Sequence, residues 1–183
     1  LKNTGINTNP VYTRQKGADN PFDTVDLGAQ SNAAPTSMDM DNDGDLDMVI
    51  GTGSVAAGKQ LVYLKNTGTK TNPVYTQQNG ADNPFDGMNV GNFASPTSLD
   101  MDNDGDLDMV VGNELGKLVY LKNTGTNTNP VYTQQNGADN PFDTVDVGDY
   151  AAPTSMDIDK DGDLDMVVGN SDEIGRASCR ERV

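Results

Sequence analysis

Short apolar runs separated by polar turns dominate the pattern along the chain. In one stretch these runs occupy residues 96–101, 107–111, 117–122 and 130–133, and each is bounded by Gly, Asn, Asp or Pro. Runs of this length with these boundaries are typical of β-strands, and no segment shows sustained helical periodicity. The run at 107–111 ends in Met-Val-Val, which is apolar on both faces and predicts a strand covered on both sides. The pattern predicts an all-β protein.

The same runs recur along the chain as a repeat. An acidic nonapeptide begins at residues 39, 100 and 157, so its spacings are 61 and 57 residues. The extra residues of the first spacing fall in 51–60, as expected of a hairpin tip. Four strands per repeat predict the four-stranded antiparallel blades of a β-propeller, in which neighbouring units cover each other's apolar faces. Three further boxes mark the repeats: Lys-Asn-Thr-Gly from Lys2, Lys65 and Lys122, Asn-Pro-Val-Tyr-Thr from Asn9, Asn72 and Asn129, and Ala-Asp-Asn-Pro-Phe-Asp from Ala18, Ala81 and Ala138.

Residues 1–172 are predicted to hold two complete blades flanked by partial ones. Residues 1–26 supply the tail of a third strand and the outer strand of one blade, and residues 153–172 supply the inner two strands of another. Propellers have about four to eight blades, so three blade equivalents do not close a normal ring. We therefore expect either a longer natural protein or chains that join head to tail.

The last stretch, residues 173–183, differs in composition from the rest. It holds three of the four Arg, the only Cys and two of the three Glu. Its sequence is similar to the in-frame translation of a common short-read sequencing adapter, so we interpret it as a non-native tail and exclude it from the fold prediction. Residues 1–172 then contain no Cys, which is compatible with an oxidising or extracellular setting.

The acidic nonapeptide Asp-x-Asp-x-Asp-Gly-Asp-Leu-Asp carries the candidate chemistry. Carboxylates occupy positions 1, 3, 5, 7 and 9, and Gly at position 6 permits a sharp turn. Ca²⁺ prefers about six to eight oxygen ligands in a forgiving geometry, which such a loop supplies. We expect side-chain ligands at positions 1, 3, 5 and 9 and a backbone carbonyl at position 7. An EF-hand would have Glu at position 12, where this chain has Ile50, Val111 and Val168. The predicted ligands, with one Ca²⁺ per loop in each of three loops, are Asp39, Asp41, Asp43, Asp45, Asp47, Asp100, Asp102, Asp104, Asp106, Asp108, Asp157, Asp159, Asp161, Asp163 and Asp165.

A hairpin turn with solvated acids is the alternative to a metal loop. Mutual repulsion within the crowded loops disfavours it, because the chain carries 28 acidic against 12 basic side chains and a net charge of −16. The third loop has Lys160 at position 4, which we expect to point outward and leave the site intact. The excess of acidic over basic side chains and the lack of a basic stripe argue against nucleic acid as a partner. Without His, no His-based catalysis is available, and the apolar runs are too short to span a membrane.

These loops, each followed by an apolar strand, make the chain resemble FG-GAP/VCBS repeats, a family that includes the Ca²⁺-binding blades of the integrin α-subunit propeller. The resemblance covers residues 1–172, although residues 91–96 are only loosely similar to the family's Phe-Gly and Gly-Ala-Pro signature. It implies a β-propeller with Ca²⁺ at the loops that join the first two strands of each blade. It does not imply one activity, because such propellers serve adhesion, sugar binding and scaffolding. Our leading hypothesis is a secreted or cell-surface, non-catalytic module for adhesion or matrix contacts, whose partners are other blades, copies of the chain, glycans or matrix proteins.

Two other functions remain open at this point. Near-identical repeats are also compatible with a structural subunit of an extracellular fibre, and the third possibility is a carbohydrate-binding module. Catalysis by paired carboxylates is disfavoured, because a catalytic pair is unique in its chain whereas these loops are repeated. One set of aromatic side chains could either stack on sugars or form the core between blades: Tyr12, Tyr75, Tyr132, Phe22, Phe85 and Phe142.

Overall fold

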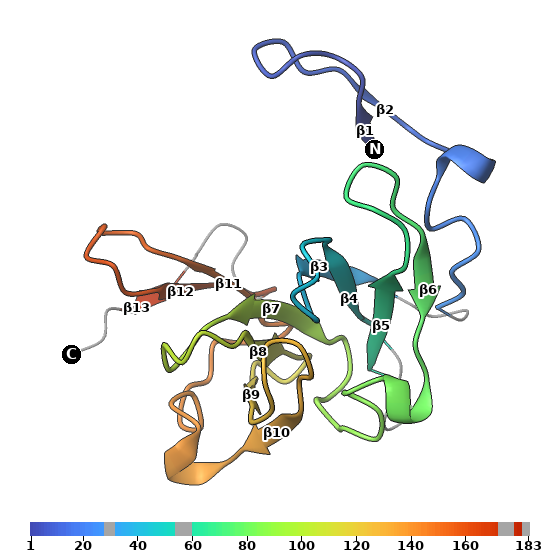
Figure 1. Cartoon of the computed structure of the whole chain (residues 1–183). Helices are drawn as coiled ribbons and strands as arrows, with labels where there is room; N and C mark the ends of the chain where they lie inside the picture. Colours follow the sequence, from blue (N-terminus) through green and yellow to red (C-terminus); the bar gives the residue numbers. More distant parts are fainter. Residues whose placement is uncertain (28–31, 54–59, 172–177, 181–183) are drawn as a thin grey trace.

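The computed structural model describes residues 1–27, 32–53 and 60–171 and the backbone of residues 178–180 (Figure 1). Over these ranges the chain is all-β, as predicted, with sheets of two, three and four strands. Three one-turn 3-10 helices, η1 (Gly17–Asp19), η2 (Gly80–Asp82) and η3 (Gly137–Asp139), follow outer strands, and segments this short leave no periodicity to predict them. The strands are β1 (Lys2–Asn3), β2 (Tyr12–Thr13), β3 (Ala34–Met38), β4 (Asp47–Gly51), β5 (Leu61–Asn66), β6 (Tyr75–Gln77), β7 (Ser95–Leu99), β8 (Asp108–Gly112), β9 (Leu118–Asn123), β10 (Tyr132–Gln135), β11 (Ala152–Met156), β12 (Asp165–Gly169) and β13 (Ser178–Arg180).

Two complete four-stranded blades occupy the middle of the chain. Their strands pair in the orders β3-β4-β5-β6 and β7-β8-β9-β10, each antiparallel to its neighbour. The register repeats between blades, because Thr36 lies opposite Val49 in the first and Thr97 lies opposite Val110 in the second. The predicted four strands per repeat are confirmed.

Adjacent blades pack through their first strands. β7 contacts both β3 and β11, and Figure 1 shows these three strands towards the middle of the molecule. A backbone hydrogen bond from Ala94 N to Thr52 O, at 3.1 Å, links the two complete blades. Another, from Ala151 N to Asn113 O at 3.0 Å, links the second complete blade to the C-terminal partial blade. Blades that meet through one repeated interface form part of a propeller-type fold.

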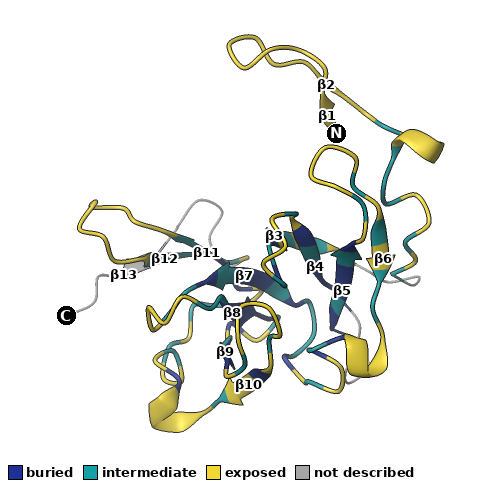
Figure 2. Cartoon of the chain, viewed as in Figure 1, coloured by how far each residue is buried: buried dark blue, intermediate teal, exposed yellow. Residues whose placement is uncertain are grey.

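The apolar core lies within the blades and between them (Figure 2). β8 is buried along its whole length, and Met109, Val110 and Val111 expose no surface, which confirms the strand predicted to be covered on both faces. Phe85 and Tyr132 are also buried, with ring centroids 4.7 Å apart, in the cluster that joins the two complete blades. Burying a large apolar side chain contributes roughly 1.5–3 kcal/mol, so this cluster ties one blade to the next.

Partial blades flank the complete ones. β1 and β2 form a hairpin that pairs Lys2 with Thr13, in the register that pairs Lys65 with Thr76 between β5 and β6. β11 and β12 pair as first and second strands, and β13 adds backbone pairs along β12. β13 falls in the tail that we excluded from the fold prediction. The adapter origin of residues 173–183 stays a prediction, and 173–177 and 181–183 lie outside the described residues.

The predicted hairpin tip within 51–60 falls largely outside the described residues, which omit 54–59. The flanking residues belong to one hairpin, because Thr52 N donates to Gln60 O at 2.8 Å between β4 and β5. Across the described part of the chain, no helix has the length and apolar character needed to cross a membrane.

Candidate metal centre

Each acidic loop joins the first two strands of its blade. Residues 39–47 connect β3 to β4, residues 100–108 connect β7 to β8, and residues 157–165 connect β11 to β12. The apolar second strand that follows each loop is packed in the sheet, so the last loop residue is tied to the blade. The fold thus presents the loops at equivalent positions of successive blades.

Two positions of the loop adopt left-handed backbone conformations. At position 6, φ is +90° at Gly44 and +100° at Gly162, which glycine adopts without a Cβ penalty. At position 4, φ is +55° at Asn42 and +64° at Lys160. Asn tolerates this region, whereas for Lys the conformation costs about 1 kcal/mol, so the third turn carries a small strain that the first does not.

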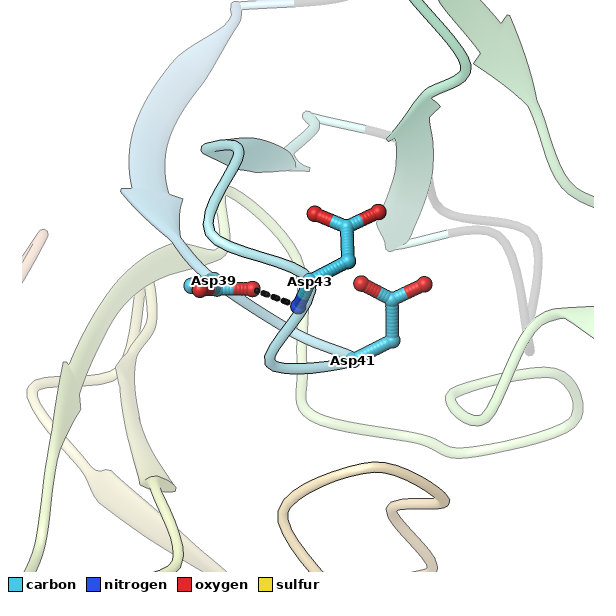
Figure 3. Close-up of side chains that lie close together, drawn as sticks. All are labelled: Asp39, Asp41 and Asp43. Atoms are coloured by element: carbon cyan, nitrogen blue, oxygen red, sulfur yellow. Dashed lines mark hydrogen bonds between the residues drawn. The ribbon is translucent and has the colours of Figure 1, made fainter. Parts of the chain in front are cut away.

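The carboxylate at position 1 closes the turn. In the first loop, Asp39 accepts hydrogen bonds from Asp43 N at 3.1 Å and Gly44 N at 3.0 Å, the first of which is drawn in Figure 3. Asp100 accepts the equivalent bonds from Asp104 N at 3.1 Å and Gly105 N at 2.9 Å. These bonds orient the carboxylate towards the centre of the loop without help from other blades.

The carboxylates at positions 1, 3 and 5 converge in both complete blades. One oxygen from each of Asp39, Asp41 and Asp43 lies within 4.8 Å of the others, and Figure 3 shows these side chains together. Asp100, Asp102 and Asp104 form the same cluster in the second loop. The Oδ1 atom of Asp41 is buried and has no hydrogen-bond partner among the described residues. A buried carboxylate oxygen is costly to leave unpaired, so this atom fits a cation as its missing partner.

Position 9 has a different environment in the complete blades. Asp108 is fully buried and accepts hydrogen bonds from Asn123 N at 2.7 Å, the Tyr120 hydroxyl at 2.7 Å and Met101 N at 3.2 Å. Asp47 has the equivalent three partners. Neither belongs to the cluster of three carboxylates in its loop. The hydrogen bonds from Asn66 N and Asn123 N instead make position 9 an anchor between the loop and the third strand.

The third loop gathers a different set of carboxylates. Its cluster contains positions 1, 3 and 9, which are Asp157, Asp159 and Asp165. Asp165 is half-buried and accepts a hydrogen bond from Ile158 N at 2.9 Å, so it is less enclosed than Asp108. Asp161 and the position-7 residues of all loops lie outside these clusters; the latter are Asp45, Asp106 and Asp163.

A comparison with known families agrees with this architecture. The family model of the FG-GAP-like repeat matches residues 39–111 and residues 100–168. These two spans overlap, and each begins at one acidic loop and ends in the strand that follows the next acidic loop. The chain belongs to the FG-GAP-like repeat family. No curated protein and no solved structure shows significant similarity to the chain.

Two lysines of the FG-GAP-like repeats reach the acidic loops from the third strand. Lys65 Nζ forms an ion pair with Asp41 Oδ2, and Lys122 Nζ forms one with Asp102 Oδ2. Sequence reasoning did not assign these lysines to the site. The signal was present, because each opens a Lys-Asn-Thr-Gly box that follows its loop in the repeat, but the order of the boxes alone does not show that the strand folds back over the loop.

The repeated aromatic residues support the loops and the blade interfaces. Tyr75 and Tyr132 donate hydrogen bonds from their hydroxyls to the carbonyl oxygens of Leu46, at 3.2 Å, and Leu107, at 2.9 Å. Phe22 stacks on Tyr75 with ring centroids 4.5 Å apart, as Phe85 packs on Tyr132. The contacts favour the packing role of these rings over a sugar-stacking row, although Tyr12 is exposed.

Burial shifts the pKa values of the position-9 carboxylates. It raises the pKa of Asp47 and of Asp108 above the usual 3.8, although the backbone and tyrosine hydrogen bonds act in the opposite direction. The hydrogen bond from Lys122 instead lowers the pKa of Asp102. Burial, and to a smaller extent the neighbouring carboxylates of Asp47 and Asp108, also raises the pKa values of Tyr63 and Tyr120, so both hydroxyls remain protonated donors at neutral pH.

These shifts predict that mild acid stabilises the metal-free chain. A carboxyl with a raised pKa in the folded state favours folding when protonated, and that contribution is lost as the pH rises through the folded pKa. We expect the thermal unfolding midpoint in metal-stripped buffer to rise as the pH is lowered from about 7 to about 5. The opposite contribution of Asp102 is lost only below its unfolded pKa of 3.8, outside this window. Circular dichroism melts across the window provide the measurement. An unfolding midpoint that falls as the pH is lowered would contradict the assignment.

Proposed function

We propose that the chain is a non-catalytic, Ca²⁺-binding repeat module of an extracellular propeller, used for adhesion or matrix contacts. The observation that carries the metal part is the convergence of three carboxylates, one of which, Asp41, has a buried Oδ1 atom with no hydrogen-bond partner in the described part of the chain. Carboxylate oxygens are hard ligands without His or Cys among them, a donor set that favours Ca²⁺ over transition metals.

The residues that would hold the ion are those of the converging clusters. In the first loop these are Asp39, Asp41 and Asp43, with backbone carbonyls and water available to complete the coordination shell. Bound Ca²⁺ would supply positive charge that offsets the repulsion among the carboxylates. The chain's own residues prepare the site, because hydrogen bonds orient position 1 and the buried Asp47 fastens the end of the loop to β5.

The non-catalytic part of the proposal is supported by repetition. The two complete loops have matching hydrogen bonds and matching clusters, whereas a catalytic carboxylate pair has one copy with distinct environments for acid and base. The extracellular setting is supported by the absence of Cys from residues 1–172 and by the net charge of −16, which suits a Ca²⁺-rich medium. Glycans or matrix proteins are the partners we propose for the exposed faces of the blades.

Calorimetric titration of the full chain with Ca²⁺ tests the proposal. We expect binding of about three ions, with affinities down to the millimolar range typical of extracellular modules. Asp41→Asn is expected to weaken one site at least about tenfold, because a charged ligand becomes neutral. Asp86→Asn makes the same charge change at an exposed position outside the loops and is the matched control.

Two results separate the parts of the proposal. A chain that shows no heat of binding in excess Ca²⁺ would contradict the metal assignment. Retention of the chain on immobilised matrix proteins or glycans in Ca²⁺, with release in EGTA, is the result expected of an adhesion module. Ca²⁺ binding without any such retention would leave a metal-binding repeat and remove the adhesion role.

A further inference from the structure

The third strand of each complete blade touches the acidic loop with two consecutive residues. In β5, Lys65 forms its ion pair with Asp41 at position 3, and the backbone N–H of Asn66 donates to Asp47 at position 9 at 2.7 Å. In β9, Lys122 and Asn123 make the same two contacts with the second loop. Because the strand fixes the backbone, the position of each ammonium group is set by the same pairing that buries position 9.

The lysine uses only one of the two oxygens of the position-3 carboxylate. Lys65 contacts Oδ2 of Asp41, while Oδ1 is the buried atom for which the described residues provide no hydrogen-bond partner. The side chains of this pair are 38% and 20% exposed, and those of Lys122 and Asp102 are 35% and 33% exposed, so neither pair is fully solvated. An ammonium group therefore lies beside the cluster, and a cation at the free oxygen would lie close to it.

We propose that Lys65 and Lys122 are internal counter-ions that hold the metal-free loops together and lower the affinity of those loops for Ca²⁺. Without metal, each lysine neutralises part of the repulsion among three carboxylates. With metal, the ammonium group and Ca²⁺ repel each other across one carboxylate. Linkage requires these effects to be reciprocal, so a lysine that opposes Ca²⁺ binding contributes less to stability once Ca²⁺ is bound.

The two lysines thereby help to set the Ca²⁺ concentration at which the first two loops bind the ion. Its affinity part rests on the proposed Ca²⁺ function, whereas its counter-ion part concerns the metal-free chain alone. A third ion pair offers a comparison outside the loops. Lys117 Nζ lies 3.7 Å from Asp146 Oδ2, and the two side chains are 49% and 64% exposed.

The test compares the double variant Lys65→Met/Lys122→Met with Lys117→Met in the full chain. In the double variant we expect Ca²⁺ to bind about three- to tenfold more tightly at the affected sites, as for loss of a nearby, partly screened positive charge. We also expect its thermal unfolding midpoint in EGTA to fall below that of the parent, with the gap narrowing in saturating Ca²⁺. Lys117→Met should change neither quantity. Lys65→Arg/Lys122→Arg keeps the charge and should restore the midpoint in EGTA.

Unchanged or weaker Ca²⁺ binding by the double variant would overturn the affinity part, and an unchanged midpoint in EGTA would overturn the counter-ion part. If none of the chains binds Ca²⁺, the proposed function fails and the affinity part fails with it, while the EGTA melts still decide the counter-ion part. If the double variant does not fold, Lys122→Met alone gives the same readouts, since the Asp102 carboxylate of that pair is more exposed than Asp41.

Discussion

Replacing Gly51 or Gly112 with alanine is expected to destabilise the chain by about 3 kcal/mol. A Cβ atom added at Gly51 would lie 1.9 Å from the carbonyl oxygen of Ala94 and 2.7 Å from Cδ of Pro96. At Gly112 it would lie 2.2 Å from the carbonyl oxygen of Ala151. Most of these neighbours are backbone atoms of the next blade, so the overlap can be relieved only by moving the blades apart.

The third blade provides a matched control at the same repeat position. Among the described residues, the atom nearest to a Cβ atom at Gly169 would be the carbonyl oxygen of Ala152 at 3.9 Å, an ordinary contact. None of the three glycines has a left-handed φ, so the expected difference arises from space alone. Gly169→Ala should therefore change stability by no more than about 0.5 kcal/mol.

Chemical denaturation and thermal melts measure the difference. For a chain of this length, a loss of about 3 kcal/mol lowers the unfolding midpoint by roughly 6–12 °C. The interface explains the size of the effect, because β7 approaches β4 closely enough for Ala94 N to donate to Thr52 O. If Gly51→Ala and Gly112→Ala were as stable as Gly169→Ala, the blades would not pack through this contact.

Much of the blade could be predicted from local sequence. The runs at 107–111 and 117–122 have strand-like composition and are punctuated by Gly and Asn, and both became strands within two residues of the predicted bounds. The repeat then implied that blades cover each other. The interface itself was not predictable in this way, because the need for glycine at Gly112 comes from Ala151 of the following blade, which is distant in sequence.

The candidate site also has features that depend on local sequence and features that depend on residues distant in the chain. In the first loop, the convergence of positions 1, 3 and 5 is accompanied by contacts that all lie within the loop, namely the left-handed Gly44 and the hydrogen bonds to Asp39. The environment of position 9 is not local in this way, because its partners Tyr63 and Asn66 come from β5. The prediction that position 9 is a side-chain ligand stays a prediction, and its anchoring role became visible only with the folded third strand.

Replacing Asp108 with alanine is expected to cost about 4 kcal/mol even in EGTA, a larger loss than either glycine variant. The side chain is completely buried and satisfies three donors, Asn123 N, the Tyr120 hydroxyl and Met101 N. Each donor left unpaired in the interior costs about 1–3 kcal/mol, and relaxation or entry of water recovers part of the sum.

Asp165→Ala is the matched control for this second effect, because Asp165 occupies position 9 of the third loop in a half-buried setting with a hydrogen bond from Ile158 N. We expect it to cost only about 1 kcal/mol in EGTA, the value of one partly exposed hydrogen bond. Measuring both variants without metal separates anchoring from any loss of a Ca²⁺ ligand. If the two variants lost equal stability in EGTA, burial beneath the third strand could not be what distinguishes the loops. The larger loss at Asp108 would instead mean that contacts with the third strand stabilise the acidic loop in the absence of any cation.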